Sequence, residues 1–211
     1  MLTFPRHLLI ESPRSLEEYG PFALRLRGRF SGIMFRYGEG VDPLLFVSAT
    51  LTAELGFSLY LHLRDMNRIA LSSVLRSAAA LNIKLIFLGE PLLIPGVEPI
   101  GFSDSIAFLS FARSIVSQDI VFGASNLLAN EPDRRLLLRQ SESGMRIFAV
   151  PPHAVASECL RRPASEIWNR LRPTDGITVK SCADAPILVD FADLGNISYD
   201  EIEGRLQEMS L

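Results

Sequence analysis

The stretch from Phe57 to Leu88, FSLYLHLRDMNRIALSSVLRSAAALNIKLIFL, contains the pattern that decides the fold. Phe57–Leu63 is a short apolar and aromatic run, which is typical of a strand. Asn67–Leu81 is long enough for a helix and is apolar on one face. Ile83–Leu88 is a second short apolar run. A strand, a helix and a strand in this order predict one βαβ unit with parallel strands.

The same alternation continues on both sides of this unit. The other predicted strands are Leu8–Glu11, Gly32–Arg36, Asp119–Gly123, Arg146–Val150, Ile177–Lys180 and Pro186–Phe191. The other predicted helices are Ser15–Arg27, Pro43–Leu55, Asp104–Val116, Pro132–Ser143, His153–Leu171 and Ser198–Met209. About eight strands alternating with helices predict a compact (β/α)8 TIM-like barrel, and residues 1–211 are expected to form a single domain.

The end of the predicted barrel is less regular. The segment Lys180–Pro186 is too short to hold a helix, so the last two strands are expected to close irregularly or as a hairpin. The helix His153–Leu171 is expected to break near Pro163. An open doubly wound sheet is the alternative architecture.

Composition excludes several classes of function. A net charge of −3 argues against a nucleic-acid surface, which is usually strongly basic. No apolar run reaches the ~20 residues of a membrane helix, and Met1–Ile10 lacks the apolar core of a signal peptide. Cys159 and Cys182 fit no metal or redox motif, and the three histidines lie far apart in the sequence. These observations predict a cytoplasmic protein without a metal site and without a membrane or nucleic-acid partner.

Two segments resemble a known enzyme family. Arg64–Leu71, RDMNRIAL, continues through Ser77–Lys84, SAAALNIK, and ends in LGEP at Leu88–Pro91. This pattern resembles methylenetetrahydrofolate reductases, in which a strand ends in R-D-x-N-R, a helix continues A-L-x-S and A-A-L-G-I, and the next strand ends in G-D-P. Ile10–Arg14, IESPR, similarly resembles the family's E-F-F-P-P-[RK].

The resemblance implies a fold, a cofactor and a reaction. Members of that family are (β/α)-barrels that hold FAD at the carboxyl ends of the strands and reduce methylenetetrahydrofolate in one-carbon metabolism. It therefore implies a flavin-linked oxidoreductase, with FAD or alternatively FMN as cofactor and a reduced pterin or folate as partner. Several predicted loops are short, so a second subunit or a homo-oligomer is expected to complete the site.

The resemblance also assigns candidate site residues. Glu11 matches the acidic residue that delivers a proton and is the predicted catalytic residue. The predicted cofactor-binding residues are Arg36, Tyr37, Tyr60, Arg64, Gly89, Glu90 and Asn126. Asp65 is interpreted as a helix cap rather than a cofactor ligand, and His62 is interpreted as a structural residue.

Several positions, three of them at the predicted site, depart from the family pattern. Glu90 replaces an aspartate, Arg36 replaces a threonine, and Pro151 replaces the glutamine that holds the pterin. Proline offers no side-chain hydrogen bond, so that pterin contact is absent. A non-catalytic accessory barrel that has lost folate binding is the alternative. A lyase or aldolase using Lys180 as a Schiff base is a third reading.

Overall fold

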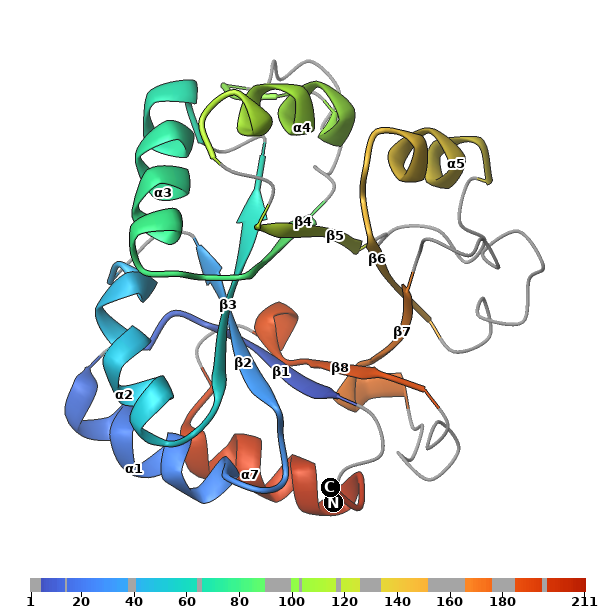
Figure 1. Cartoon of the computed structure of the whole chain (residues 1–211). Coiled ribbons are helices and arrows are strands. Elements are labelled where there is room, and N and C mark those ends of the chain that lie inside the picture. The colour runs from blue at the N-terminus through green and yellow to red at the C-terminus, as the bar shows by residue number, and fades with distance from the viewer. Residues whose placement is uncertain are drawn as a thin grey trace. The chain divides into compact units, whose positions relative to one another are not determined.

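A computed structural model gives the structure of residues 5–13, 15–37, 41–63, 66–89, 100–102, 104–116, 119–125, 134–151, 166–175, 185–194 and 197–211. Eight parallel strands form a closed barrel in chain order, as Figure 1 shows. They are β1 (Arg6–Glu11), β2 (Gly32–Tyr37), β3 (Gly56–His62), β4 (Leu85–Gly89), β5 (Val121–Ser125), β6 (Ile147–Val150), β7 (Glu166–Leu171) and β8 (Ile187–Asp190). The predicted TIM-like barrel is confirmed, and the open sheet is wrong.

Helices follow most of the strands. They are α1 (Leu16–Leu26), α2 (Val47–Thr52), α3 (Arg68–Ala80), α4 (Ser105–Arg113), α5 (Arg134–Glu142) and α7 (Tyr199–Glu208). Among the described residues there are also three short 3-10 turns: η1 (Pro43–Phe46), η3 (Pro173–Asp175) and η5 (Ala192–Leu194). No helix in the part of the chain that the structure describes is long and apolar enough to cross a membrane.

Side-chain caps fix where four helices begin. Ser15, Asn67, Asp104 and Ser198 each accept a hydrogen bond from the backbone N–H three residues later. Each cap satisfies one of the amide groups that a helix start leaves without an intrahelical partner. The cap of α3 is therefore Asn67, whereas Asp65, the predicted cap, lies outside the described residues.

The prediction for the seventh strand is wrong. β7 occupies Glu166–Leu171, inside the segment predicted as a helix from His153. Its Trp168–Leu171 half is buried, which suits a strand packed on both faces. The predicted strand Ile177–Lys180 lies outside the described residues. The expected hairpin closure is also wrong, because β7 pairs with β8, and β8 with β1, in parallel.

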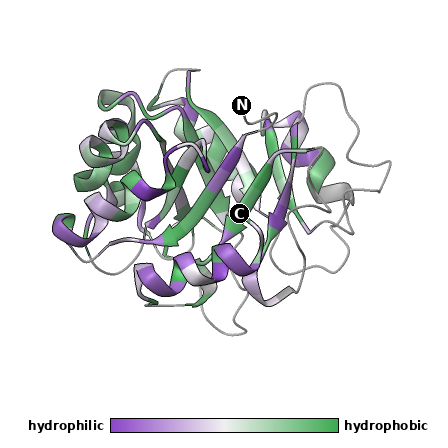
Figure 2. Cartoon of the chain, turned by 90° about the horizontal axis from the view of Figure 1, so that it is seen from below, coloured by the Kyte–Doolittle hydropathy of each residue, from purple (hydrophilic) through white to green (hydrophobic). Residues whose placement is uncertain are grey.

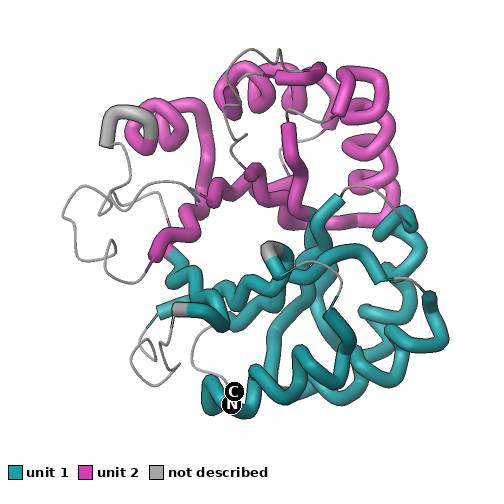
Figure 3. Tube along the Cα trace, turned by 180° about the vertical axis from the view of Figure 1, so that it is seen from behind, with its two compact units in different colours: residues 1–59, 168–211 teal, residues 60–167 magenta. Residues whose placement is uncertain are grey.

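The chain divides into two compact units, coloured separately in Figure 3. Unit 1 comprises residues 1–59 and 168–211. In it β1 pairs in parallel with both β2 and β8, and α1 and α7 cover one face of these strands. Tyr19 of α1 meets Phe35 of β2 with ring centroids 5.3 Å apart and shares a 2.6 Å hydrogen bond with Thr50. Burial of this aromatic contact holds α1 on the sheet.

Unit 2 comprises residues 60–167, in which β4, β5 and β6 pair in parallel. Phe102, between β4 and α4, contacts both Phe108 and Phe111 of α4. Phe108 also lies edge-on to Phe122 of β5, which joins the helix to the sheet. The hydropathy colouring of Figure 2 shows the strands as largely apolar and the helices as mixed, as expected of helices that cover a sheet.

Candidate functional site

An ion pair joins the ends of β1 and β2. Glu11 is the last residue of β1 and stands in register with Arg36 of β2. The Arg36 Nη1 donates to Glu11 Oε1 at 3.0 Å and lies 3.3 Å from the carbonyl oxygen of Ala192. The Glu11 side chain is 31% exposed and the Arg36 side chain 28% exposed, so a ligand can reach both. Arg36 is thus fixed by two acceptors from different segments of unit 1.

A second, buried ion pair lies beside the first. Arg170 of β7 donates through Nε to Asp190 Oδ2 at 2.9 Å and also through Nη2. The other oxygen of Asp190 accepts the backbone N–H of Ala192 at 2.9 Å. Both side chains are almost fully buried. Asp190 therefore holds the same residue, Ala192, whose carbonyl contacts Arg36.

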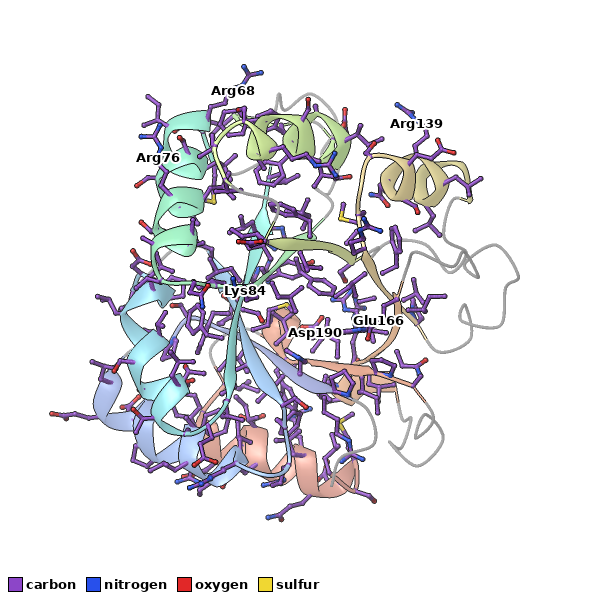
Figure 4. All side chains as sticks on the ribbon, viewed as in Figure 1. Arg68, Arg76, Lys84, Arg139, Glu166 and Asp190 are labelled. Atoms are coloured by element: carbon purple, nitrogen blue, oxygen red, sulfur yellow. The ribbon has the colours of Figure 1, made fainter. Side chains whose placement is uncertain are left out.

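The four charged side chains share one face of the strands. Phe35 of β2 packs on Tyr19 of α1, and Ile10 stands in register with Phe35 on β1. Side chains alternate along a strand, so Glu11 and Arg36 point to the opposite face. Asp190 stands in register with Leu9 and Arg170 with Leu188, which places both charges on that opposite face too. We call this the inner face of unit 1, and Figure 4 labels Asp190 on it.

A cavity of about 550 Å³ lies on the other side of Glu11, where β1 and β8 end next to α1 and α7. Its lining combines apolar side chains with several acidic ones. The lining residues are Ile10, Glu11, Ser12, Pro13, Glu17, Glu18, Pro21, Arg25, Phe191, Ile197, Ser198, Tyr199, Asp200 and Ile202. Arg25 forms an ion pair with Glu203, with 2.6 Å between Arg25 Nε and Glu203 Oε1. Burial, together with the nearby Tyr19 and Glu18, raises the pKa of the Tyr199 hydroxyl.

Of the other predicted site residues, one belongs to unit 1, two belong to unit 2 and three lie outside the described residues. Tyr37 follows Arg36 directly, so its side chain points to the helical face; burial and then Asp42 raise the pKa of its hydroxyl. Tyr60 and Gly89 lie in unit 2, where a Cβ at Gly89 would stand 2.6 Å from the Tyr60 Oη. Gly89 thus has a packing role, because the Tyr60 ring occupies its missing side chain. Arg64, Glu90 and Asn126 lie outside the described residues, as does Lys180.

Sequence reasoning missed the buried ion pair. The signal was present: Asp190 directly follows three apolar residues of β8, and Arg170 stands between Trp168 and Leu171 of β7. Charged side chains are rarely buried unless paired, so each one predicts a partner. The partner could not be identified, because β7 had been predicted as part of a helix.

The described residues do not assemble a metal site. No group of three histidine, cysteine, aspartate or glutamate side chains comes together among them. Glu11 and Asp190 are each held by an arginine instead.

The barrel is similar to many solved structures at low sequence identity. Phosphonopyruvate hydrolase, solved in complex with oxalate and Mg²⁺, is 13% identical over 97% of this chain and 80% of its own, with a TM-score of 0.61. 2,3-Dimethylmalate lyase, of the PEP mutase/isocitrate lyase superfamily, is 11% identical over 99% of this chain and 82% of its own, also with a TM-score of 0.61. Tryptophan synthase from M. tuberculosis is 14% identical over 98% of this chain and 92% of its own, with a TM-score of 0.63. The sequence itself matches no protein-family profile and no curated protein.

These neighbours correct the functional expectations. The similar structures include barrels of the PEP mutase/isocitrate lyase superfamily rather than methylenetetrahydrofolate reductases, so the proposed family resemblance is wrong. The oxidoreductase activity, the role in one-carbon metabolism and the alternative of an accessory subunit are overturned with it. FAD and FMN are withdrawn as cofactors: the named ligands of the phosphonopyruvate hydrolase neighbour are oxalate and Mg²⁺. At such identities the similarity establishes the fold alone.

Proposed function

We propose that this chain is an enzyme of the lyase or hydrolase type that acts on a small carboxylate. The observation behind the proposal is the Glu11–Arg36 pair at the carboxyl ends of β1 and β2. Barrel enzymes place their active sites at this end of the strands. Three neighbours of the same fold are named for carboxylate substrates: phosphonopyruvate hydrolase, 2,3-dimethylmalate lyase and oxaloacetate acetylhydrolase.

Arg36 is suited to bind the substrate's carboxylate. A guanidinium group presents parallel N–H donors that match the two oxygens of a carboxylate. Ala192 and Glu11 both accept from the same nitrogen, Nη1, which fixes the orientation of the guanidinium plane. A carboxylate bound to Arg36 would lie next to Glu11, on the inner face of unit 1.

Glu11 is then the group that moves the proton. Its carboxylate can accept a proton from a substrate hydroxyl, which begins cleavage of the adjacent C–C bond, or from a water molecule, which begins hydrolysis. Substrate bound to Arg36 competes with Glu11 for the guanidinium group and leaves the Glu11 carboxylate adjacent to the reacting atoms.

Calorimetric titration with oxalate, with and without Mg²⁺, tests the binding part of the proposal. Arg36→Gln is expected to weaken oxalate binding by at least about tenfold, the effect of losing one charge-assisted contact. Glu11→Gln is expected to retain or tighten binding, since it removes a negative charge next to the bound dianion, while any turnover is lost.

Arg27→Gln is the matched control. Arg27 also belongs to unit 1 and also pairs with a glutamate, Glu54, but on the exposed surface of the unit. Its removal should leave oxalate affinity unchanged. Equal affinities of the Arg36→Gln and Arg27→Gln proteins would refute the role of Arg36.

A further inference from the structure

A basic groove lies on unit 2, away from the strands, between α3 and α4. It encloses about 500 Å³, and its lining includes Arg68, Ile69, Ser72 and Arg76 of α3 and Phe111 of α4. Figure 4 shows Arg68 and Arg76 projecting from α3 toward solvent. The groove belongs to neither the inner face of unit 1 nor the acidic cavity beside α1.

α3 carries a net positive charge, although the chain as a whole is acidic. The whole chain has a net charge of −3, yet α3 contains two arginines and no acidic residue. α1 and α7 each place two acidic residues in the first turn, where the helix dipole favours negative charge, whereas α3 begins with Arg68. Among the described residues, neither Arg68 nor Arg76 forms an ion pair. The start of α3 therefore lacks the negative charge that would stabilise it.

Arg68 is held in place without an acidic partner. Its guanidinium carbon stands 5.0 Å from the centroid of the Phe102 ring, within the range of a cation–π contact. Phe102 is itself fixed, because its N–H donates to the Leu63 carbonyl at 3.1 Å and its ring lies 5.0 Å from that of Phe111. This contact positions Arg68, which remains an exposed residue in the lining of the groove.

The spacing along α3 brings three donors to one place. Arg68, Ser72 and Arg76 follow one another at intervals of four residues, so they lie on one side of the helix over about 12 Å. Ser72 sits one turn from each arginine, and both long side chains can reach an anion bound above its hydroxyl. Phe111 and Ile69, which is 84% exposed, supply apolar surface next to that point.

We propose that this groove binds a phosphate ester whose phosphate is joined to an apolar or aromatic group. Two guanidinium groups and a hydroxyl supply more donors than one carboxylate can accept, and they match the several oxygens of a phosphate. The organic part would cover Ile69 and Phe111.

Isothermal titration with phenyl phosphate tests the proposal on the whole chain. Phenyl phosphate is expected to bind more tightly than inorganic phosphate, because only the ester can use the apolar surface. Arg76→Gln is expected to weaken the binding of phenyl phosphate by about tenfold. This effect of the substitution should be smaller at high salt, where charges are screened. Ser72→Ala is expected to weaken it by a smaller factor.

Arg139→Gln is the matched control, since Arg139 is an exposed arginine of unit 2 on α5, labelled in Figure 4. It should bind phenyl phosphate like the unaltered protein, and so should Arg36→Gln, which separates this groove from the proposed active site. Arg76 is exposed, so its replacement should leave the melting temperature unchanged. Equal affinity of the Arg76→Gln and Arg139→Gln proteins would overturn the proposal. So would equal affinity for phenyl phosphate and inorganic phosphate, or tighter binding of an oligoglutamate peptide at the same groove.

Discussion

His7 illustrates how a single residue can tie stability to pH. The imidazole lies on β1 next to Gly32, with its ring 4.7 Å from that of Trp168. Its Nδ1 is buried and has no hydrogen-bond partner among the described residues. Burial disfavours the charged form and lowers the pKa of His7 from 6.5 to about 4. His7 is therefore neutral in the folded protein at neutral pH and serves as packing.

The consequence is a loss of stability in mild acid. Between pH 6.5 and 4 the unfolded chain binds a proton at His7 that the folded chain does not. The free energy of unfolding is fully retained above pH 6.5 and should fall by up to about 3 kcal/mol as the pH drops to 4. Urea unfolding at several pH values measures this. In His7→Asn the fall should be smaller by that amount, with His62 and His153 unchanged in both proteins; parallel pH curves for the two would contradict the assignment.

At the scale of elements, the buried ion pair links two strands and a turn. Arg170 belongs to β7, Asp190 ends β8, and Ala192 begins η5. A parallel pair of strands has no hairpin to fix its register, so side-chain pairs can help to specify it. The pair also places Ala192, whose carbonyl contacts Arg36. The elements that carry the proposed site are therefore connected by hydrogen bonds from β7 through to β1.

A double-mutant cycle measures the coupling free energy between Arg170 and Asp190. Asp190→Leu and Arg170→Met should each destabilise the protein by about 3–5 kcal/mol, because each leaves the other charge buried without its partner. The double variant should regain most of that loss, since apolar groups replace both charges. Chemical denaturation of the four proteins measures the coupling. Additive losses would show that the two side chains stabilise the fold independently.

At the scale of the molecule, the sequence predicted the architecture better than the site. Short apolar runs such as Leu85–Gly89 and well-capped helices such as α3 are local signals, and they were found close to their observed bounds. β7 was missed because Glu166–Leu171 follows a long segment that reads as helical, and only pairing with β8 makes it a strand. Strand pairing joins residues far apart in the chain, which local patterns do not encode.

The site was predicted residue by residue but not as an arrangement. Glu11 and Arg36 were placed correctly at strand ends, yet their ion pair depends on the register of β1 against β2. Motif resemblance misled the assignment of function, because the described part of RDMNRIAL forms the Asn67 cap and the start of α3, a local feature of the fold that carries no chemistry of its own. Chemistry is a property of the side chains that the fold brings together rather than of the βαβ pattern itself.

The central claim is that a small carboxylate binds at the carboxyl ends of β1 and β2 through Arg36. A crystal structure of the protein grown with oxalate and Mg²⁺ tests it most directly. We predict one carboxylate of oxalate within hydrogen-bond distance of the Arg36 guanidinium, on the inner face of unit 1 and next to Glu11. Oxalate ordered only at another place, with Arg36 still held by Glu11 and Ala192 alone, would contradict the claim.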